Sequence, residues 1–298
     1  MTSMPPAPVR PYPLAALAAL RPKQWTKNFL LFAALIFSSH FTDTRSWLNA
    51  TLAFVTFCLL SSTGYVYNDL HDIEADRKHP KKRHRPLARG EISVRGAWVL
   101  MAGCVVTAMA IAWTISQWFT VVALLYFITT LSYSMLFKHY VILDVMFLAA
   151  CYIWRAVAGA VGIAVPISPW LLLCTAFLAL FLGFNKRRGE IMLLESKNAG
   201  TRKSLAHYSP AMLQEFQAIT TSGTIISYAL YTVLGSPTPW LLLTLPHVLY
   251  GIFRYIYLMD QKGEGAAPDE TLLRDRPIQL TCLFFLVTAI AVLVAAPH

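Results

Sequence analysis

The stretch WLNATLAFVTFCLLSSTGYVYNDLHDIEAD, residues 47–76, joins a long apolar run to a dense group of carboxylates. Its apolar part is close to the roughly 20 residues that cross a bilayer core about 30 Å thick. If one helix continues through the acidic part, Asp69, Asp72 and Asp76 fall at positions i, i+3 and i+7 on one face. Carboxylates so close repel each other unless a cation neutralises them, and oxygen ligands of this kind suit Mg²⁺ held against phosphates. The spacing alone leaves a metal site and an ordinary solvated helix end equally open.

The composition identifies a membrane protein. The chain has 298 residues, of which 56% are hydrophobic and only 13% are charged. We therefore expect an all-α protein with nine transmembrane helices, because helices satisfy their own backbone hydrogen bonds in lipid. The nine apolar runs cover residues 25–41, 47–67, 94–115, 118–136, 141–165, 169–184, 216–234, 240–258 and 278–296.

The net charge of +10 is distributed by side of the membrane. With nine crossings, the loops on the amino-terminal side hold nearly every Lys and Arg, and the opposite loops hold only Arg45. This asymmetry follows the positive-inside rule. It predicts a protein of the inner (cytoplasmic) membrane with its amino terminus and acidic motif in the cytoplasm and its carboxy terminus outside. The basic charge is thereby explained by membrane lipid and phosphate, without nucleic acid.

The chain is expected to form one domain. Residues 1–20 are predicted to be a disordered tail, because they begin Pro-rich and their apolar run, 14–20, is too short to span a bilayer. Residues 21–298 show no internal repeat and form the transmembrane domain. The five cysteines lie singly in apolar runs, so neither a disulfide nor a zinc site is implied. Whether the chain forms homo-oligomers is left open.

Polar and cationic residues at the cytoplasmic ends of the first two apolar runs are candidate phosphate ligands. Lys23, Lys27 and Asn28 precede or begin the first run, where they either anchor the helix at the interface or hold anionic oxygens. The loop 77–89 is strongly basic, and most of its cations are expected to face lipid headgroups. Arg85 is the expected exception, because Pro86 stiffens the loop beside it.

Three further residues are candidates by position. Tyr133 and Lys138 close the fourth run on the cytoplasmic side, where a short loop must lie beside the other cytoplasmic loops. Arg155 lies deep in the fifth run, where a charge costs at least about 2.5–3.5 kcal/mol. We therefore expect Arg155 to line a polar cavity.

The sixth run ends in Asn185-Lys186-Arg187-Arg188-Gly189-Glu190. On a continuing helix, Glu190 lies one turn from Lys186 and from Arg187. This is either a salt-bridged helix end or a pair of cations, steadied by one carboxylate, that suits a phosphate monoester.

Together these motifs resemble the UbiA-type superfamily of intramembrane prenyltransferases, over nearly the whole chain from Arg21 onward. That family has nine helices around a central cavity open to the cytoplasm. Its Asn-Asp-x-x-Asp-x-x-x-Asp motif is matched by Asn68, Asp69, Asp72 and Asp76, which the resemblance implies to be Mg²⁺ ligands. The segments 85–87, 133–138 and 155–159 are similar as well.

The sixth run departs from most members, which carry a second Asp-rich motif there. The segment 185–190 resembles instead the decaprenyl-phosphate phosphoribosyltransferase branch, as do the segments 21–28 and 72–80 and the loop 265–276. The resemblance implies transfer of 5-phosphoribose from phosphoribosyl diphosphate (PRPP) to a polyprenyl phosphate, with release of diphosphate. The product would be a precursor of lipid-linked arabinose donors for cell-envelope glycans.

Residue roles follow from that reaction. Asn68, Asp69, Asp72 and Asp76 would hold Mg²⁺ on the diphosphate of PRPP, and Asp72, Asp76, Lys186 and Arg187 would be the catalytic residues. Lys186 and Arg187 would bind the 5-phosphate, with Glu190 orienting them. The remaining candidates, expected to bind or steer substrate phosphates, are Lys23, Lys27, Asn28, Arg85, Tyr133, Lys138 and Arg155.

Two other functions were weighed against this one. A prenyltransferase acting on an aromatic or quinone precursor would share the fold and the first motif, but Lys186 and Arg187 replace the acidic pair that it would use. A lipid or phosphate transporter would typically show repeated halves with broken spans, and the sequence indicates neither.

Overall fold

A computed structural model describes residues 10–38, 40, 42–79, 82–195, 205, 207–262, 271 and 274–295. Throughout this part of the chain the regular secondary structure is helical, with no strand. The expectation of an all-α protein is therefore confirmed. The loop 265–276 and the cations Lys197, Arg202 and Lys203 fall wholly or mostly outside the described residues.

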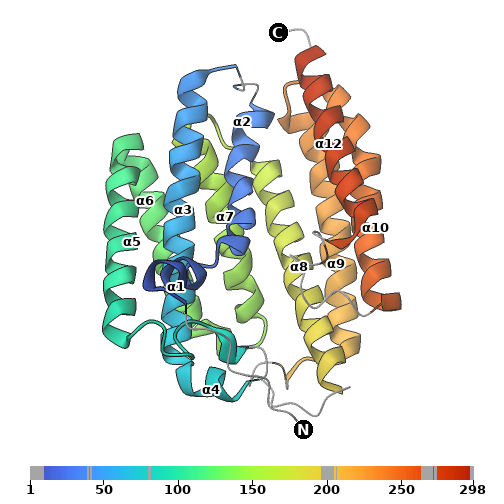
Figure 1. The fold of residues 1–298 in the computed structure, drawn as a ribbon. Helices are drawn as coiled ribbons and strands as arrows, with labels where there is room; N and C mark the ends of the chain where they lie inside the picture. The colour runs from blue at the N-terminus through green and yellow to red at the C-terminus, as the bar shows by residue number, and fades with distance from the viewer. Residues whose placement is uncertain are drawn as a thin grey trace.

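Seven helical segments within the described ranges are long and apolar enough to cross a membrane, which makes the chain a multi-pass integral membrane protein. Figure 1 shows them side by side along a common direction. They are α3 (Thr44–His71), α5 (Val94–Ile115), α6 (Gln117–Met135), α7 (Leu143–Gly162), α8 (Pro169–Glu195), η6 (Pro239–Thr244) with α10 (Leu245–Lys262), and α12 (Arg276–Ala295).

The first of the nine expected spans is not an ordinary α-helix. It consists of η1 (Pro22–Phe32), a 3₁₀ helix, and the short α2 (Ala33–Phe37). A 3₁₀ helix rises about 2.0 Å per residue, so these segments together extend about 30 Å, roughly the thickness of a bilayer core. Figure 1 shows this pair running along the bundle next to α3 and α7.

The other expected span outside the seven is α9 (Pro210–Leu230), which ends in a π-helical turn, η5 (Tyr231–Gly235). Its buried face carries polar side chains, among them Thr220, Thr224 and Ser227. Their hydroxyls donate to carbonyls one turn earlier in the same helix, at 2.6–2.7 Å. These polar groups are thus satisfied within α9, which packs extensively against α8.

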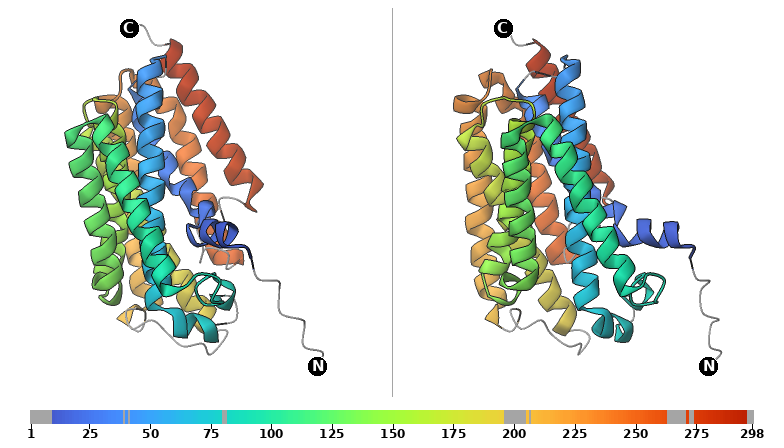
Figure 2. Two further views of the ribbon diagram at one scale, coloured as in Figure 1. Left: turned by 60° about the vertical axis from the view of Figure 1, so that its left-hand side comes forward. Right: turned by 90° about the vertical axis from the view of Figure 1, so that its left-hand side faces the viewer.

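The amino-terminal tail contains a helix, which corrects the prediction of disorder over residues 1–20. Helix α1 (Tyr12–Ala19) lies across the bundle (Figure 2). Its Ala15 and Ala19 are fully buried and pack in a cluster with Val66 of α3. Residues 1–9 of the expected tail lie outside the described residues.

The acidic motif lies at one end of the bundle and bends there. Helix α3 ends at His71, and the short α4 (Ile73–Lys78) follows after Asp72, whose φ of −101° and ψ of 11° interrupt the helix. The condition of one continuous helix, from which the i, i+3 and i+7 spacing on one face was argued, is therefore not met at Asp72. Two short 3₁₀ turns, η2 (Lys82–His84) and η3 (Phe137–His139), complete the connections near this end.

A close backbone contact fixes η1 against α7. A Cβ atom added at Gly159 would collide with the carbonyl oxygen of Leu31, whose side chain is fully buried. Because the obstacle is backbone, it cannot move aside as a flexible side chain could. Only glycine at this position lets the two segments approach so closely.

We expect Gly159→Ala to destabilise the protein by about 1–3 kcal/mol, because an overpacked methyl group must displace backbone. Thermal unfolding of the detergent-solubilised protein measures the effect. Gly103→Ala is the matched control, since a Cβ atom at that helical glycine meets nothing within 4 Å. The control should be unchanged or slightly stabilised, and equal melting temperatures for the two variants would contradict the packing assignment.

Candidate functional site: two charged clusters and an apolar cavity

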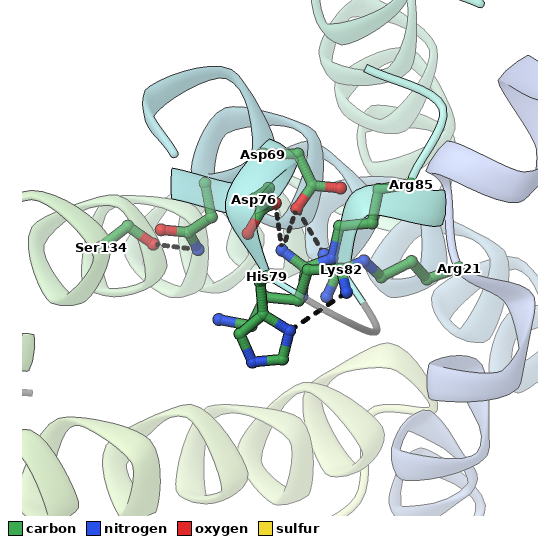
Figure 3. Close-up of polar contacts among 8 residues, drawn as sticks. Arg21, Asp69, Asp76, His79, Lys82, Arg85 and Ser134 are labelled. Carbon is green, nitrogen blue, oxygen red and sulfur yellow. Dashed lines mark hydrogen bonds and ion pairs between the residues drawn. The ribbon is translucent and has the colours of Figure 1, made fainter. Parts of the chain in front are cut away.

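Two carboxylates of the acidic motif converge on one arginine (Figure 3). Arg85 Nη1 lies 3.0 Å from Asp69 Oδ1 and 2.6 Å from Asp76 Oδ2. The exposed fractions of the two aspartate side chains are 1% and 2%, whereas that of Arg85 is 26%. The bend at Asp72 thus leaves Asp69 and Asp76 close enough to share a cation, and Arg85 stands where the sequence placed it, beside the motif.

Arg21 also forms an ion pair with Asp69, and the sequence analysis did not identify it. It caps η1 in a left-handed conformation, with φ of 52°, and its guanidinium lies 5.1 Å from the centroid of the Tyr65 ring. Arg21 and Asp69 are 48 residues apart, so local spacing could not predict their contact, and the position of Arg21 before Pro22 was the one available signal. Arg21 and Arg85 together neutralise the buried carboxylates.

The donor set of the motif fits a divalent cation. Asp69 Oδ2 is buried and has no hydrogen-bond partner among the described residues, which leaves a carboxylate oxygen available. Asn68 donates its amide NH₂ to Ser134 Oγ at 3.1 Å, so its amide oxygen is a further hard ligand, and Asp72 is half-buried at the bend. Within the described ranges, however, no three acidic, His or Cys side chains converge closely enough to hold a metal by themselves.

A second charged cluster surrounds Arg187 near the end of α8. Arg187 is fully buried, and its Nε lies 2.7 Å from Oδ2 of the equally buried Asp144. Its Nη1 donates to Glu190 Oε2 at 2.7 Å, as the i, i+3 spacing predicts. Asp144 and its partner Tyr208 are site residues to which sequence reasoning gave no role, because the contact between them spans 64 residues.

Tyr208 completes this cluster. Its hydroxyl donates to Asp144 Oδ1 and accepts from the backbone N–H of Ile142, both at 2.7 Å. Burial, together with the hydrogen bond to the carboxylate, raises the pKa of Tyr208 well above its usual value. The phenol therefore stays protonated as a donor.

The other charged residues of the segment 185–190 differ in how exposed they are and in what they contact. Lys186 is half-buried beside Arg187, and Glu190 keeps 30% of its side chain exposed. Arg188 pairs with Asp260 of α10 at 2.7 Å and donates to Gln217 of α9 at 3.0 Å. Arg188 therefore ties three helices together.

Arg155 is satisfied by neutral protein groups at depth. Its Nε donates to Asn28 Oδ1 at 2.7 Å, Nη1 to the Cys151 carbonyl at 3.0 Å and Nη2 to Tyr126 Oη at 2.9 Å. Its guanidinium also lies 5.0 Å from the centroid of the Tyr126 ring. Instead of facing open space, Arg155 and the fully buried Asn28 join α7 to η1.

The other predicted phosphate ligands lie nearer the surface. Lys23 is exposed, and Lys27 is half-buried with its Nζ donating to Gln24 Oε1 at 2.7 Å. Tyr133 and Lys138 are half-buried, and Tyr133 lies within electrostatic range of Arg187. The adjacent Ser134 bonds Asn68, so two neighbouring residues of α6 connect the acidic motif with the Arg187 cluster.

An apolar cavity of about 1100 Å³ extends between the helices. Its walls come from η1, α2, α7, α8, α9, α10 and α12, and among the described residues that line it Lys27 is the one Lys, Arg, Asp or Glu. Phe29, Leu30 and Phe37 are typical of its lining. Such a volume can bury a large hydrocarbon ligand.

Comparison with known proteins finds relatives over most of the chain. The model of the UbiA prenyltransferase family matches residues 16–273. The chain is 33% identical to the decaprenyl-phosphate phosphoribosyltransferase of Corynebacterium glutamicum, covering 90% of this chain and 83% of that protein. It is 32% identical to the protein of the same name from Mycolicibacterium smegmatis, with 91% and 90% covered.

Solved structures share the fold. A UbiA homolog from Archaeoglobus fulgidus bound to GPP and Mg²⁺ superposes with a TM-score of 0.73 at 22% identity, covering 94% of this chain and 100% of that chain. A digeranylgeranylglyceryl phosphate synthase has a TM-score of 0.69 at 19% identity, with 94% and 99% covered. With the family model spanning most of its length, the chain belongs to the UbiA prenyltransferase family.

Proposed function

We propose that this protein transfers the 5-phosphoribosyl group of PRPP to a polyprenyl phosphate of decaprenyl type and releases diphosphate. The observation that supports the proposal is the presence of two charged clusters, one built on carboxylates and one on an arginine, which are linked through the neighbouring α6 residues Ser134 and Tyr133. One site has a buried carboxylate oxygen without a donor, at Asp69, and the other has a buried guanidinium nitrogen without an acceptor, Nη2 of Arg187, within the residues described. PRPP carries a diphosphate that binds metal and a separate phosphate that needs cations. The names of the relatives support the same reaction.

In this proposal Asn68, Asp69, Asp72 and Asp76 would hold the Mg²⁺ that accompanies the diphosphate. The chemistry supplied by a bound ion would be neutralisation of the charge on the leaving diphosphate. Arg21 and Arg85 hold the carboxylates in place and stand ready for diphosphate oxygens that the ion does not reach.

The 5-phosphate binds at the second cluster. Lys186 supplies an ammonium group, and Arg187 presents Nη2 while Asp144 pairs with its Nε and Glu190 accepts from its Nη1. Direct cations thereby replace the second metal site of prenyl-transferring members. An oxygen of the lipid phosphate, already anionic near neutral pH, attacks C1 of the ribose as the bond from C1 to the diphosphate oxygen breaks. Positioning and charge neutralisation supply most of the rate enhancement.

The polyprenyl chain occupies the apolar cavity, with its phosphate directed toward the charged end. Lys27 lines the cavity and would meet that phosphate, and Lys23, Tyr133 and Lys138 are further candidates for steering it. Asn28 and Arg155 contribute by holding η1, and therefore Lys27, against α7.

The proposal includes the topology. We infer nine crossings, with η1–α2 and α9 added to the seven long apolar helices, and an orientation with the acidic motif in the cytoplasm and the carboxy terminus outside the inner membrane. The product would serve as a precursor of lipid-linked pentose donors for cell-envelope glycans.

The direct experiment supplies purified protein with Mg²⁺, PRPP labelled in the ribose, and a polyprenyl phosphate, followed by extraction of the lipid phase. Label in the lipid that requires both Mg²⁺ and PRPP supports the proposal. Folded protein that transfers no label, yet prenylates an aromatic acceptor from a prenyl diphosphate, would replace it with the alternative reaction.

Asp72→Asn and Asp76→Asn should each lower Mg²⁺-dependent turnover by at least about 100-fold, because each removes a charge from the proposed metal site. Glu74→Gln is the matched control, since its side chain lies in the same short helix and is 78% exposed. Initial rates across a Mg²⁺ titration check the prediction. Normal rates for both aspartate variants would remove the motif from the reaction.

Lys186→Ala should raise the apparent KM for PRPP by about 10- to 100-fold, the loss expected for one charge-assisted hydrogen bond to phosphate. The apparent KM for the lipid phosphate should stay within about twofold. Steady-state kinetics with each substrate varied in turn make the measurement, and Lys78→Ala, at an exposed lysine of α4, is the control. An unchanged KM for PRPP would assign Lys186 a purely structural role.

A further inference from the structure

We infer that Tyr208 is a positioning residue for the proposed phosphoribosyl transfer, on which this inference rests. Its hydroxyl fixes Asp144, and Asp144 in turn fixes the direction of the Arg187 guanidinium. Tyr208 thereby controls how Arg187 presents its remaining nitrogen to a phosphate.

The first observation is a strained turn before α7. Ile142 has φ of 68° and ψ of −51°, and the N–H of Leu143 donates to the Val141 carbonyl at 2.8 Å, which closes a three-residue γ-turn. This form of γ-turn is rare, and a β-branched residue with positive φ is an outlier. Such strain persists only where surrounding contacts hold it.

Tyr208 supplies one of those contacts. The backbone N–H of Ile142 donates to the Tyr208 hydroxyl at 2.7 Å, and that hydroxyl donates onward to Asp144 Oδ1 at 2.7 Å. Asp144 lies in the first turn of α7, two residues after Ile142. One phenol oxygen thus sets both the turn and the rotation of the carboxylate that follows it.

The carboxylate then sets Arg187. With Oδ1 held by Tyr208, Asp144 Oδ2 forms an ion pair with Arg187 Nε at 2.7 Å, outside hydrogen-bond geometry, and Glu190 Oε2 accepts from Nη1 at 2.7 Å. Contacts with two carboxylates therefore limit how the guanidinium can turn. Nη2, which is buried and makes no hydrogen bond to any described residue, is the nitrogen left for a ligand oxygen.

Packing holds the Tyr208 ring independently of its hydroxyl. The ring is buried in an apolar cluster with Val145, Phe184 and Leu213. The next residue, Ser209, caps α9 by accepting from the N–H of Met212 at 3.2 Å. Replacing Tyr208 by Phe should therefore remove the two hydrogen bonds and leave the ring in place.

Tyr208→Phe should raise the apparent KM for PRPP about tenfold, because the oriented interaction of Arg187 with phosphate is lost. The apparent KM for the polyprenyl phosphate should remain within about twofold of the wild-type value. Tyr140→Phe is the matched control, since Tyr140 lies two residues before Ile142 in the connection to α7, is 60% exposed and loses the same atom. A Tyr208→Phe protein with an unchanged KM for PRPP would overturn the inference.

A double-mutant cycle separates positioning from general support of the structure. Arg187→Lys keeps the charge but removes Nη2, so adding Tyr208→Phe to it should change the KM for PRPP by less than about twofold. Additive effects of the two substitutions would show that Tyr208 does not act through Arg187.

A second double-mutant cycle tests whether Tyr208 acts on PRPP binding through Arg187 or only through the strained turn. Ile142→Gly accepts positive φ without strain and should restore the melting temperature lost in Tyr208→Phe, but not the KM for PRPP. Recovery of that KM in the double variant would assign Tyr208 to the turn alone. If Tyr208→Phe by itself fails to fold, the double variant carries the measurement.

The failure of this inference is distinguishable from failure of the proposed function. Wild-type protein that does not transfer ribose from PRPP removes the function and the inference together. Active wild-type protein with an unaffected Tyr208→Phe variant removes the inference alone.

Discussion

The requirement that a charge buried in a membrane domain find partners governs this structure. An uncompensated charge at depth in a bilayer is costly, and breaking one partner from a buried ion pair leaves the other exposed to that cost. Arg155, Arg187, Asp69 and Asp76 are all nearly or fully buried, and each is held by residues from other segments. The helices that supply these partners are therefore fixed relative to each other by polar contacts as well as by packing.

The two charged clusters differ in which sign of charge is buried. At the acidic motif the carboxylates are buried and the arginines are partly exposed, with 26% exposed for each of Arg21 and Arg85. At the end of α8 the arginine is fully buried and the carboxylate of Glu190 is 30% exposed. The outer charges at the acidic motif are therefore positive, whereas at the end of α8 both a half-buried lysine, Lys186, and the carboxylate of Glu190 lie outside the buried Arg187.

Hydropathy predicted seven of the long helices because each contains an apolar stretch long enough to cross a bilayer, and Arg85 was singled out from its basic loop because Pro86 stiffens the loop beside it. The bend at Asp72 was missed because no glycine or proline marks it. Arg21, Asp144 and Tyr208 were missed as partners because their contacts join residues 48 and 64 positions apart, which local periodicity does not detect. Burial of Arg155 followed from its depth. Its neutral partners did not, because Asn28 and Tyr126 lie on other segments.

The 3₁₀ geometry of η1 has a consequence for the length of that segment. With three residues per turn, side chains fall into columns that stay aligned along the axis, whereas α-helical side chains drift around it. Trp25, Asn28 and Leu31 form one column, which bonds Ser62 of α3, bonds Arg155 and packs against Gly159. The other two columns supply the cavity wall, including Lys27 and Leu30. Side chains on the wall columns can vary in size without touching the inner contacts. Insertion or deletion of one residue, by contrast, would exchange the columns, turning Asn28 away from Arg155 and Lys27 away from the cavity at the same time.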